Sequence, residues 1–179
     1  MYKGEGKSLK FIYVERDWLS VGLSIHRLTA ESARQSRWFG FQAAKWNAMK
    51  VYVAEQLEAA TDAADKAFYE SLQSAMAIEQ TTTAFYKGVL EWLLARKAYL
   101  NAVNTVPTIK VKYSDVLKDV ESVSKAISDF TEGTYSIDVK QATETINKKD
   151  DFAEFTREER EQVDEFLKDK NQEKLSAEI

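Results

Sequence analysis

Residues 31–58 read ESARQSRWFGFQAAKWNAMKVYVAEQLE, and this stretch decides the fold because it places five aromatic rings on one predicted helix. At about 100° per residue the larger apolar side chains fall into two stripes, and mostly small residues fill the remaining sector. Leaving one large aromatic side chain in water forfeits about 1.5–3 kcal/mol, so both stripes need a covering surface. The two stripes are Trp38, Phe41, Met49 and Tyr52, with Lys45 in the same row, and Phe39, Ala43, Trp46, Val53 and Leu57.

Glycine and proline are sparse, with six glycines and the single Pro107, which favours long helices. We expect one helix over 29–58, with Thr29 as its N-cap, and a second over 62–104 that begins at Thr61 or Asp62. A fold-back between the two helices makes a long antiparallel hairpin, which we favour over one continuous rod.

The second predicted helix carries a similar excess of apolar surface, because aromatic residues line one of its faces and leucines line the neighbouring face. Oligomerisation through the hairpin is the first functional prediction. The alternative is a monomeric bundle closed by its own C-terminal helices. The candidate interface residues are the aromatic side chains Trp38, Phe39, Phe41, Trp46, Tyr52, Phe85, Trp92 and Tyr99.

After the hairpin, residues 105–113 (TVPTIKVKY) alternate apolar and polar side chains and predict a linker or a short edge strand. A heptad seam then predicts a helix capped by Ser114 and ended by Gly133. A weaker helix is expected over 137–147, and a capping box opens a last helix over about 156–170. The seam residues are Val116, Val120, Val123, Ile127 and Phe130.

The predicted fold class is therefore all-α and oligomeric, with a long antiparallel hairpin and smaller C-terminal helices. Its expected segments are an N-terminal arm with a short helix (1–28), the hairpin as assembly core (29–104), the linker or strand (105–113) and an acidic helical region (114–179).

Charge is distributed unevenly along the chain. Residues 1–58 carry nine Lys and Arg against six Asp and Glu, whereas residues 105–179 carry twelve against eighteen. A basic front and an acidic tail suit a protein that meets a polyanion with one end and basic proteins with the other. In the tail, Phe152 and Phe155 are candidate docking residues for a basic partner, and the alternative is a solvated acidic face.

Two stretches resemble the UvsY-type recombination mediators of bacteriophages over about residues 20–104. LSIHRLTAESARQSRWFGFQAAKW (23–46) is similar to the entry into their first long helix, with Gln35, Trp38 and Phe39 at the matching spacing. GVLEWLLARKAYLNAV (88–103) resembles their closing helix. The matching residues there are Leu90, Glu91, Leu93, Arg96, Leu100 and Val103.

The resemblance implies a small, non-enzymatic helical protein that forms a ring, binds single-stranded DNA, loosens the single-strand-binding protein and helps to load a RecA-like recombinase. Lysine and arginine contacts to phosphate supply affinity that is independent of sequence. The candidate phosphate contacts are Arg34, Arg37, Lys45 and Lys50, with Lys3, Lys7 and Lys10 as a basic arm. Trp38 and Trp46 are either platforms for base stacking or core residues, and helical spacing favours the core.

The chain departs from that family in three places, one of which is the acidic region 105–179, which has no counterpart in the resemblance. The end of the first long helix is acidic here (EQLEAATDAADK, 55–66) where the family is basic, and Ser36 stands where the family commonly has proline. All three departures bear on DNA binding more than on the fold.

Catalysis is not expected. His26 is the only histidine and the chain has no cysteine, so a histidine-rich or cysteine-ligated metal site cannot be assembled. GEGK at 4–7 lacks the spacing of a phosphate-binding loop. We therefore expect no cofactor, no membrane segment and a cytoplasmic location, the last because no leader opens the chain. The alternative function is a helical virion structural, adaptor or scaffold protein that acts only through protein–protein assembly.

Overall fold

The computed structural model describes residues 9–31, 43–77, 84–147, 156–157 and 160–161. Its contacts divide the chain into two compact units. We name the first the helical unit; its described parts are 17–31, 43–77, 84–94, 156–157 and 160–161. The second, the mixed unit, contains 9–16 and 95–147. The unit boundaries after residues 16 and 94 thus differ from the predicted segment boundaries at 28 and 104.

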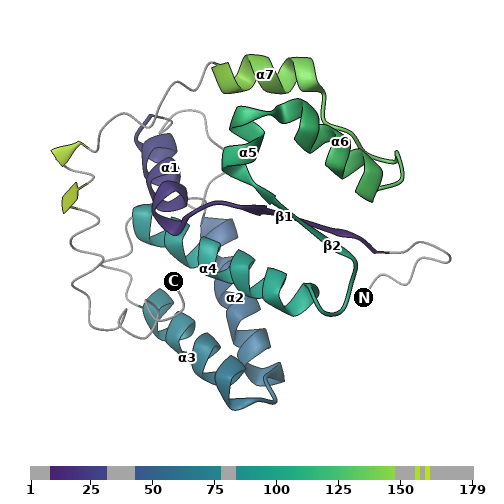
Figure 1. Cartoon of the computed structure of the whole chain (residues 1–179). Helices are drawn as coiled ribbons and strands as arrows, with labels where there is room; N and C mark the ends of the chain where they lie inside the picture. The colour runs from purple at the N-terminus through teal and green to yellow at the C-terminus, as the bar shows by residue number, and fades with distance from the viewer. Residues whose placement is uncertain (1–8, 32–42, 78–83, 148–155, 158–159, 162–179) are drawn as a thin grey trace. The chain divides into compact units, whose positions relative to one another are not determined.

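Helices α1 (Trp18–Glu31), α2 (Ala43–Ala59) and α3 (Ala63–Ala77) belong to the helical unit, together with the first part of α4 (Ala84–Ala102) (Figure 1). α2 ends at Ala59, and α3 then packs back against α2. The predicted fold-back at 59–62 is therefore confirmed, and the continuous rod is excluded.

The predicted start of the first hairpin helix is wrong. Thr29 lies inside α1, so it is not an N-cap. The start signal of α1 is Asp17 instead, whose carboxylate oxygen Oδ1 accepts a hydrogen bond from the Ser20 amide at 2.8 Å. The predicted helical segment over 32–42 lies outside the described residues.

Asp62 caps α3. Its Oδ1 atom accepts hydrogen bonds from the backbone amides of Ala64 at 2.9 Å and Asp65 at 2.8 Å. These two donors belong to the first helical turn, where the backbone has no partner of its own. The predicted cap is confirmed for Asp62.

Replacing Asp62 by alanine is expected to lower the free energy of unfolding of the helical unit by about 1 kcal/mol, because both amides lose their acceptor. Urea unfolding followed by tryptophan fluorescence measures the loss. Asp62→Asn keeps an oxygen acceptor and is the matched control. An alanine variant as stable as wild type would show that water replaces the cap at no cost.

The core of the helical unit is built from α1, α2, α3 and α4. Val53, Leu72 and Phe85 are completely buried there. Of the two predicted stripes on α2, the one with Trp46 and Val53 faces this core, whereas Tyr52 of the other stripe is exposed. Met49, from the same stripe as Tyr52, nevertheless packs against this core, so the core covers one stripe and part of the other.

α1 and α4 approach each other closely at two glycines. A Cβ atom built on Gly22 would lie 2.7 Å from Cε2 of Phe85, and one on Gly88 would lie 3.0 Å from Cα of Gly22. Real Cβ atoms essentially never show the distance at Gly22, and the distance at Gly88 is tighter than nine in ten real Cβ contacts. The missing side chains therefore permit this helix crossing.

The mixed unit contains a small two-stranded parallel sheet, which the predicted all-α class did not include. β1 (Phe11–Glu15) pairs with β2 (Thr108–Lys112), with Tyr13 opposite Lys110. β2 confirms the strand alternative for 105–113, whereas β1 was expected to be part of an arm. Parallel strands need a long crossover connection, so no local turn in the sequence reveals the pair. Most described residues are nevertheless helical.

The predicted seam helix is divided in two. α5 (Tyr113–Lys118) is followed by the non-helical Asp119, whose side-chain Oδ1 caps α6 (Val120–Phe130) by accepting a hydrogen bond from the Ser122 amide at 3.0 Å. Ser114 lies inside α5 and is not its cap. The second core nevertheless uses the seam: Val123 and Ile127 are buried against Val111 of β2.

α6 ends in a Schellman motif. The amides of Glu132 and Gly133 donate to the carbonyls of Asp129 and Ser128, and Glu132 takes the left-handed conformation with φ of 56°. Gly133, with φ of 76°, follows it, so the predicted helix end at Gly133 is confirmed with Glu132 in the position that glycine usually takes. α7 (Val139–Asn147) confirms the predicted weaker helix.

Candidate nucleic-acid interface

Two lysine side chains lie over the ring of Trp46 in the helical unit, and a third lysine pairs with a glutamate on α4. Nζ of Lys50, on α2, lies 5.7 Å from the centroid of the Trp46 ring, and Nζ of Lys87, on α4, lies 5.0 Å from it. Lys45 precedes Trp46 in the chain and its Nζ donates to Oε1 of Glu91 at 2.6 Å. We name Lys45, Lys50 and Lys87 the lysine cluster.

The ring of Trp46 lies beneath the ammonium groups of Lys50 and Lys87. It is 7% exposed and belongs to the core. A tryptophan ring attracts ammonium groups through its negative face, by about 0.5–1 kcal/mol at exposed sites. Lys50 follows Trp46 by one helical turn, and Lys87 comes from α4. A buried ring thus holds cations from two helices on the surface above it.

Glu91 offsets one of the three charges. The side chains of Lys45 and Glu91 are 37% and 36% exposed, and an ion pair this accessible contributes little net stability. Its geometry matters more, because Glu91 lies one helical turn after Lys87 on α4 and so holds Lys45 on the same side of α4 as Lys87. Three of these four charged side chains are positive.

The lysine cluster contains two predicted phosphate contacts, Lys45 and Lys50, and one residue that sequence reasoning missed. Lys87 could have been found from its spacing to Glu91, but nothing local pairs it with Trp46. Trp46 itself is too buried to stack on a base. The remaining predicted contacts on this helix and arm, Arg34, Arg37, Lys3 and Lys7, lie outside the described residues, as does Trp38.

Lys10, predicted as part of a basic arm, is engaged within the mixed unit. Its Nζ donates to the Phe130 carbonyl at 2.7 Å and to Oε1 of Glu132 at 2.6 Å. A cation at this place satisfies the carboxyl end of α6 and complements its dipole. The Lys10 ammonium also holds the pKa of the Glu132 carboxyl below its usual value, through the hydrogen bond first and the charge second. Lys10 therefore has a structural role.

The predicted interface aromatics are placed very differently. Phe85 is 0% exposed, so it presents no surface, and Trp92 is half-buried against the core of the helical unit. Tyr99, in the mixed unit, stacks on Tyr13 with ring centroids 4.3 Å apart. Tyr52 is 42% exposed. The candidate residues Phe39, Phe41, Phe152 and Phe155 lie outside the described residues.

Two pockets offer other candidate sites. One of about 300 Å³ opens beside the lysine cluster, with Lys50 and Gln73 as its polar lining and Val53, Met76 and Ala77 as its apolar lining. An apolar group attached to an anion fits this chemistry, because the ammonium stands next to apolar surface.

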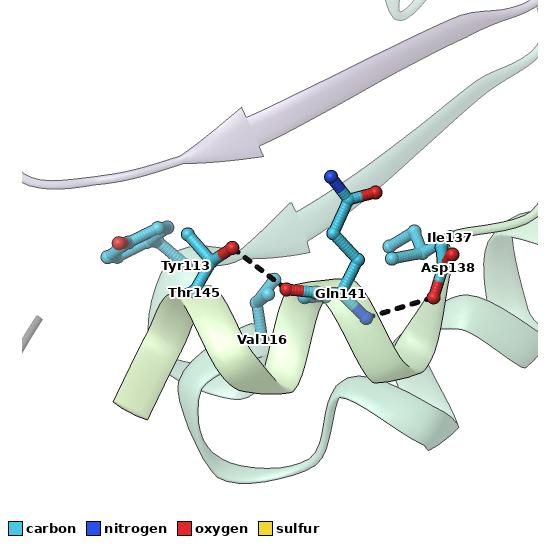
Figure 2. Close-up of a pocket in the computed structure, with 7 residues that line it drawn as sticks. Tyr113, Val116, Ile137, Asp138, Gln141 and Thr145 are labelled. Carbon is cyan, nitrogen blue, oxygen red and sulfur yellow. Dashed lines mark hydrogen bonds between the residues drawn. The ribbon is translucent and has the colours of Figure 1, made fainter. Parts of the chain in front are cut away.

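The other pocket, of about 400 Å³, lies in the mixed unit between α5 and α7 (Figure 2). Tyr113 and Thr145 stand at one end, and Ile137 and Asp138 at the other. The Gln141 amide donates to Oδ1 of Asp138 at 2.9 Å, and the Thr145 hydroxyl donates to the Gln141 carbonyl at 2.8 Å. The first bond caps the N-terminus of α7 and the second is a contact within α7. The polar groups of Asp138 and Thr145 in this pocket therefore stabilise the helix.

Over the described ranges, no group of three or more His, Cys, Asp or Glu side chains is arranged to hold a metal ion. None of the helices in that part of the chain is long and apolar enough to cross a membrane. No family model matches the chain, and neither a curated protein nor a solved structure matches it.

Proposed function

We propose that this chain is a non-enzymatic accessory protein of the recombination-mediator type, which forms a homo-oligomer, binds single-stranded DNA through the lysine cluster and helps to load a RecA-like recombinase. The observation that carries the DNA-binding part is that Lys50 and Lys87 both lie over the ring of Trp46, while Lys45 pairs with Glu91, one helical turn after Lys87. The resemblance to the UvsY-type mediators supplies the biological setting.

Phosphate contact is the interaction that this surface favours. Lysine ammoniums bind phosphates as point charges and release counterions from the nucleic acid, which gives affinity without sequence preference. Lys45 exchanges its exposed contact with Glu91 for a phosphate at small cost. Because Trp46 is buried, base stacking on it does not contribute, and the binding depends strongly on salt.

Titration of a fluorescent single-stranded oligonucleotide at several salt concentrations tests the proposal. Anisotropy should show binding at low salt, and log K should fall linearly with log salt. Absence of binding at low salt would contradict the mediator function and favour the assembly-only alternative, a virion structural, adaptor or scaffold protein.

Charge reversal at Lys50 and Lys87 together should weaken oligonucleotide binding and flatten the salt dependence. Removing one phosphate interaction reduces the slope by about 0.7 for a single strand. Lys118→Glu with Lys125→Glu is the matched control, since both lysines are exposed in the mixed unit and the change in net charge is the same. Equal losses of affinity in both double variants would mean that only net charge matters and that the lysine cluster is not the site.

A further inference from the structure

The pocket of about 300 Å³ in the helical unit lies between α2 and α3. Its lining consists of described residues, which are Lys50, Val53, Gln73, Met76 and Ala77. Val53 is 0% exposed and Met76 is 2% exposed, so the floor of the pocket belongs to the core of the helical unit. Because a packed core fixes these two side chains, the shape of the pocket does not depend on a ligand.

The rim of the pocket is polar. Lys50 contributes an ammonium group from α2, and the exposed Gln73 contributes a side-chain amide from α3. The Nζ atom of Lys50 also lies 5.7 Å from the centroid of the Trp46 ring. The pocket therefore shares Lys50 with the lysine cluster, the surface to which we assign the phosphates.

A nucleotide carries the two kinds of group that this arrangement binds. Its phosphate is an anion, and its base has an apolar face and an edge with hydrogen-bond donors and acceptors. Lys50 supplies a cation for the phosphate, the floor supplies apolar surface for the base, and the Gln73 amide supplies both a donor and an acceptor for the base edge. A volume of about 300 Å³ is at the lower end for ligand pockets and suits a single base.

A single strand offers such a base, whereas a duplex does not. In a duplex the base faces are stacked and the edges are paired, but an unpaired base turns out of the stack at small cost. Trp46 is 7% exposed and cannot act as a stacking platform, so the pocket supplies a base contact that this ring cannot. An amide with a donor and an acceptor pairs with more than one kind of base, which suits binding without a fixed sequence.

We propose that this pocket receives one unstacked base of single-stranded DNA, while Lys50 binds a neighbouring phosphate of the same strand. The inference rests on the proposed function and adds a base contact to its phosphate contacts. It assigns part of the affinity to the bases, and this part is independent of the number of phosphates bound.

An abasic strand gives the first test, because it keeps the phosphates and lacks the bases. At low salt the full chain should bind an oligodeoxythymidine at least about fivefold more tightly than an abasic strand of equal length, which is the lower end of what one base contact contributes. Fluorescence anisotropy measures both affinities. Equal affinities would overturn the base pocket.

Filling the pocket gives the second test. Ala77→Leu introduces a larger side chain at an exposed lining position. It should lower the affinity for oligodeoxythymidine about fivefold, but leave the affinity for the abasic strand and the salt dependence unchanged, because no phosphate contact is removed. An Ala77→Leu protein that binds oligodeoxythymidine as tightly as wild type would place the base contact elsewhere and overturn the proposal.

Ala67→Leu is the matched control for Ala77→Leu. It makes the same substitution at an exposed position of α3 that does not line the pocket, so it should bind both strands as wild type does. Equal losses in the two variants would mean that the effect does not come from the pocket. Far-UV circular dichroism verifies that each variant keeps its helices.

Met76 provides a direct signal from the floor of the pocket. The chain has three methionines, so a carbon-13 label on the methionine methyl groups gives a simple NMR spectrum, and Met76→Leu identifies the Met76 signal. The ring current of a bound base should shift this signal when oligodeoxythymidine is added, and the abasic strand should not. Identical Met76 shifts with the two strands would contradict a base in the pocket.

The outcomes separate this pocket from the proposed function. A chain that binds neither strand at low salt contradicts DNA binding and the base pocket together. A chain that binds both strands equally keeps the phosphate contacts of the lysine cluster and overturns the pocket alone. Tighter binding of oligodeoxythymidine that is lost in Ala77→Leu and kept in Ala67→Leu supports both.

Discussion

Replacing Phe85 by alanine lowers the free energy of unfolding of the helical unit by about 3–5 kcal/mol. Phe85 is completely buried, and the Trp18 ring meets it edge-on with centroids 6.3 Å apart. The substitution removes the apolar area of the ring and leaves a cavity between α1 and α4, and both effects destabilise. Urea unfolding followed by tryptophan fluorescence measures this loss, because Trp18, Trp46 and Trp92 all belong to the helical unit.

Tyr135→Ala is the control for Phe85→Ala. Tyr135 is 67% exposed, so its removal should change stability by no more than about 0.5 kcal/mol. A Phe85→Ala protein that unfolds at the wild-type urea midpoint would contradict the burial of this ring, and with it the packing of α4 against α1.

Replacing Gly22 by valine is the second substitution with a large expected effect. Its Cβ would lie 2.7 Å from Cε2 and 2.9 Å from Cδ2 of Phe85, and 3.1 Å from Cγ2 of Val89. The first two atoms belong to a rigid, fully buried ring, so α1 has to move away from α4. We expect a decrease in the free energy of unfolding of about 3 kcal/mol, the upper part of the usual range for overpacked cores.

The double variant Gly22→Val with Phe85→Ala distinguishes a clash from a loss of helix propensity. The cavity left by the ring accepts the new valine, so the double variant should be more stable than the sum of the two single effects predicts. Additive effects would show that the two residues do not press against each other. The same urea titration measures all three variants.

Local features of the fold could be predicted from the sequence. The break between α2 and α3 followed from one aspartate, because a capping carboxylate acts on amides two and three residues further along the chain. The end of α6 at Gly133 is a similar case. The seam of Val123 and Ile127 was visible as spacing, although the chain interrupts it at Asp119, where capping overrides helix continuity.

Non-local features could not be predicted. β1 and β2 pair residues such as Tyr13 and Lys110 that are separated by most of the helical unit, and no turn sequence marks such a pair. The role of Lys10 depends on the same arrangement, since its partners Phe130 and Glu132 come from the end of α6. The charge of Lys10 predicted a contact with a ligand, whereas its position lets its ammonium group bind the carboxyl end of α6.

The candidate site was half visible in the sequence. Lys45 and Lys50 share one helix with Trp46; the four-residue spacing groups Lys50 with Trp46, whereas Lys45 was predicted from its charge alone. Lys87 joins them only because α4 packs against α2 in the core that contains Trp46. That packing depends on the volumes of side chains on three helices, which a single periodic pattern does not specify.

The sequence by itself determined that α2 has more apolar surface than one neighbour can cover, because side-chain composition and the helical period are local properties of the chain. Only the tertiary structure decided that Trp46 and Val53 turn inwards while Val51 and Tyr52 remain exposed. The physical reason is that the period groups side chains by angle, whereas burial depends on which of those groups fits the shapes of α3 and α4.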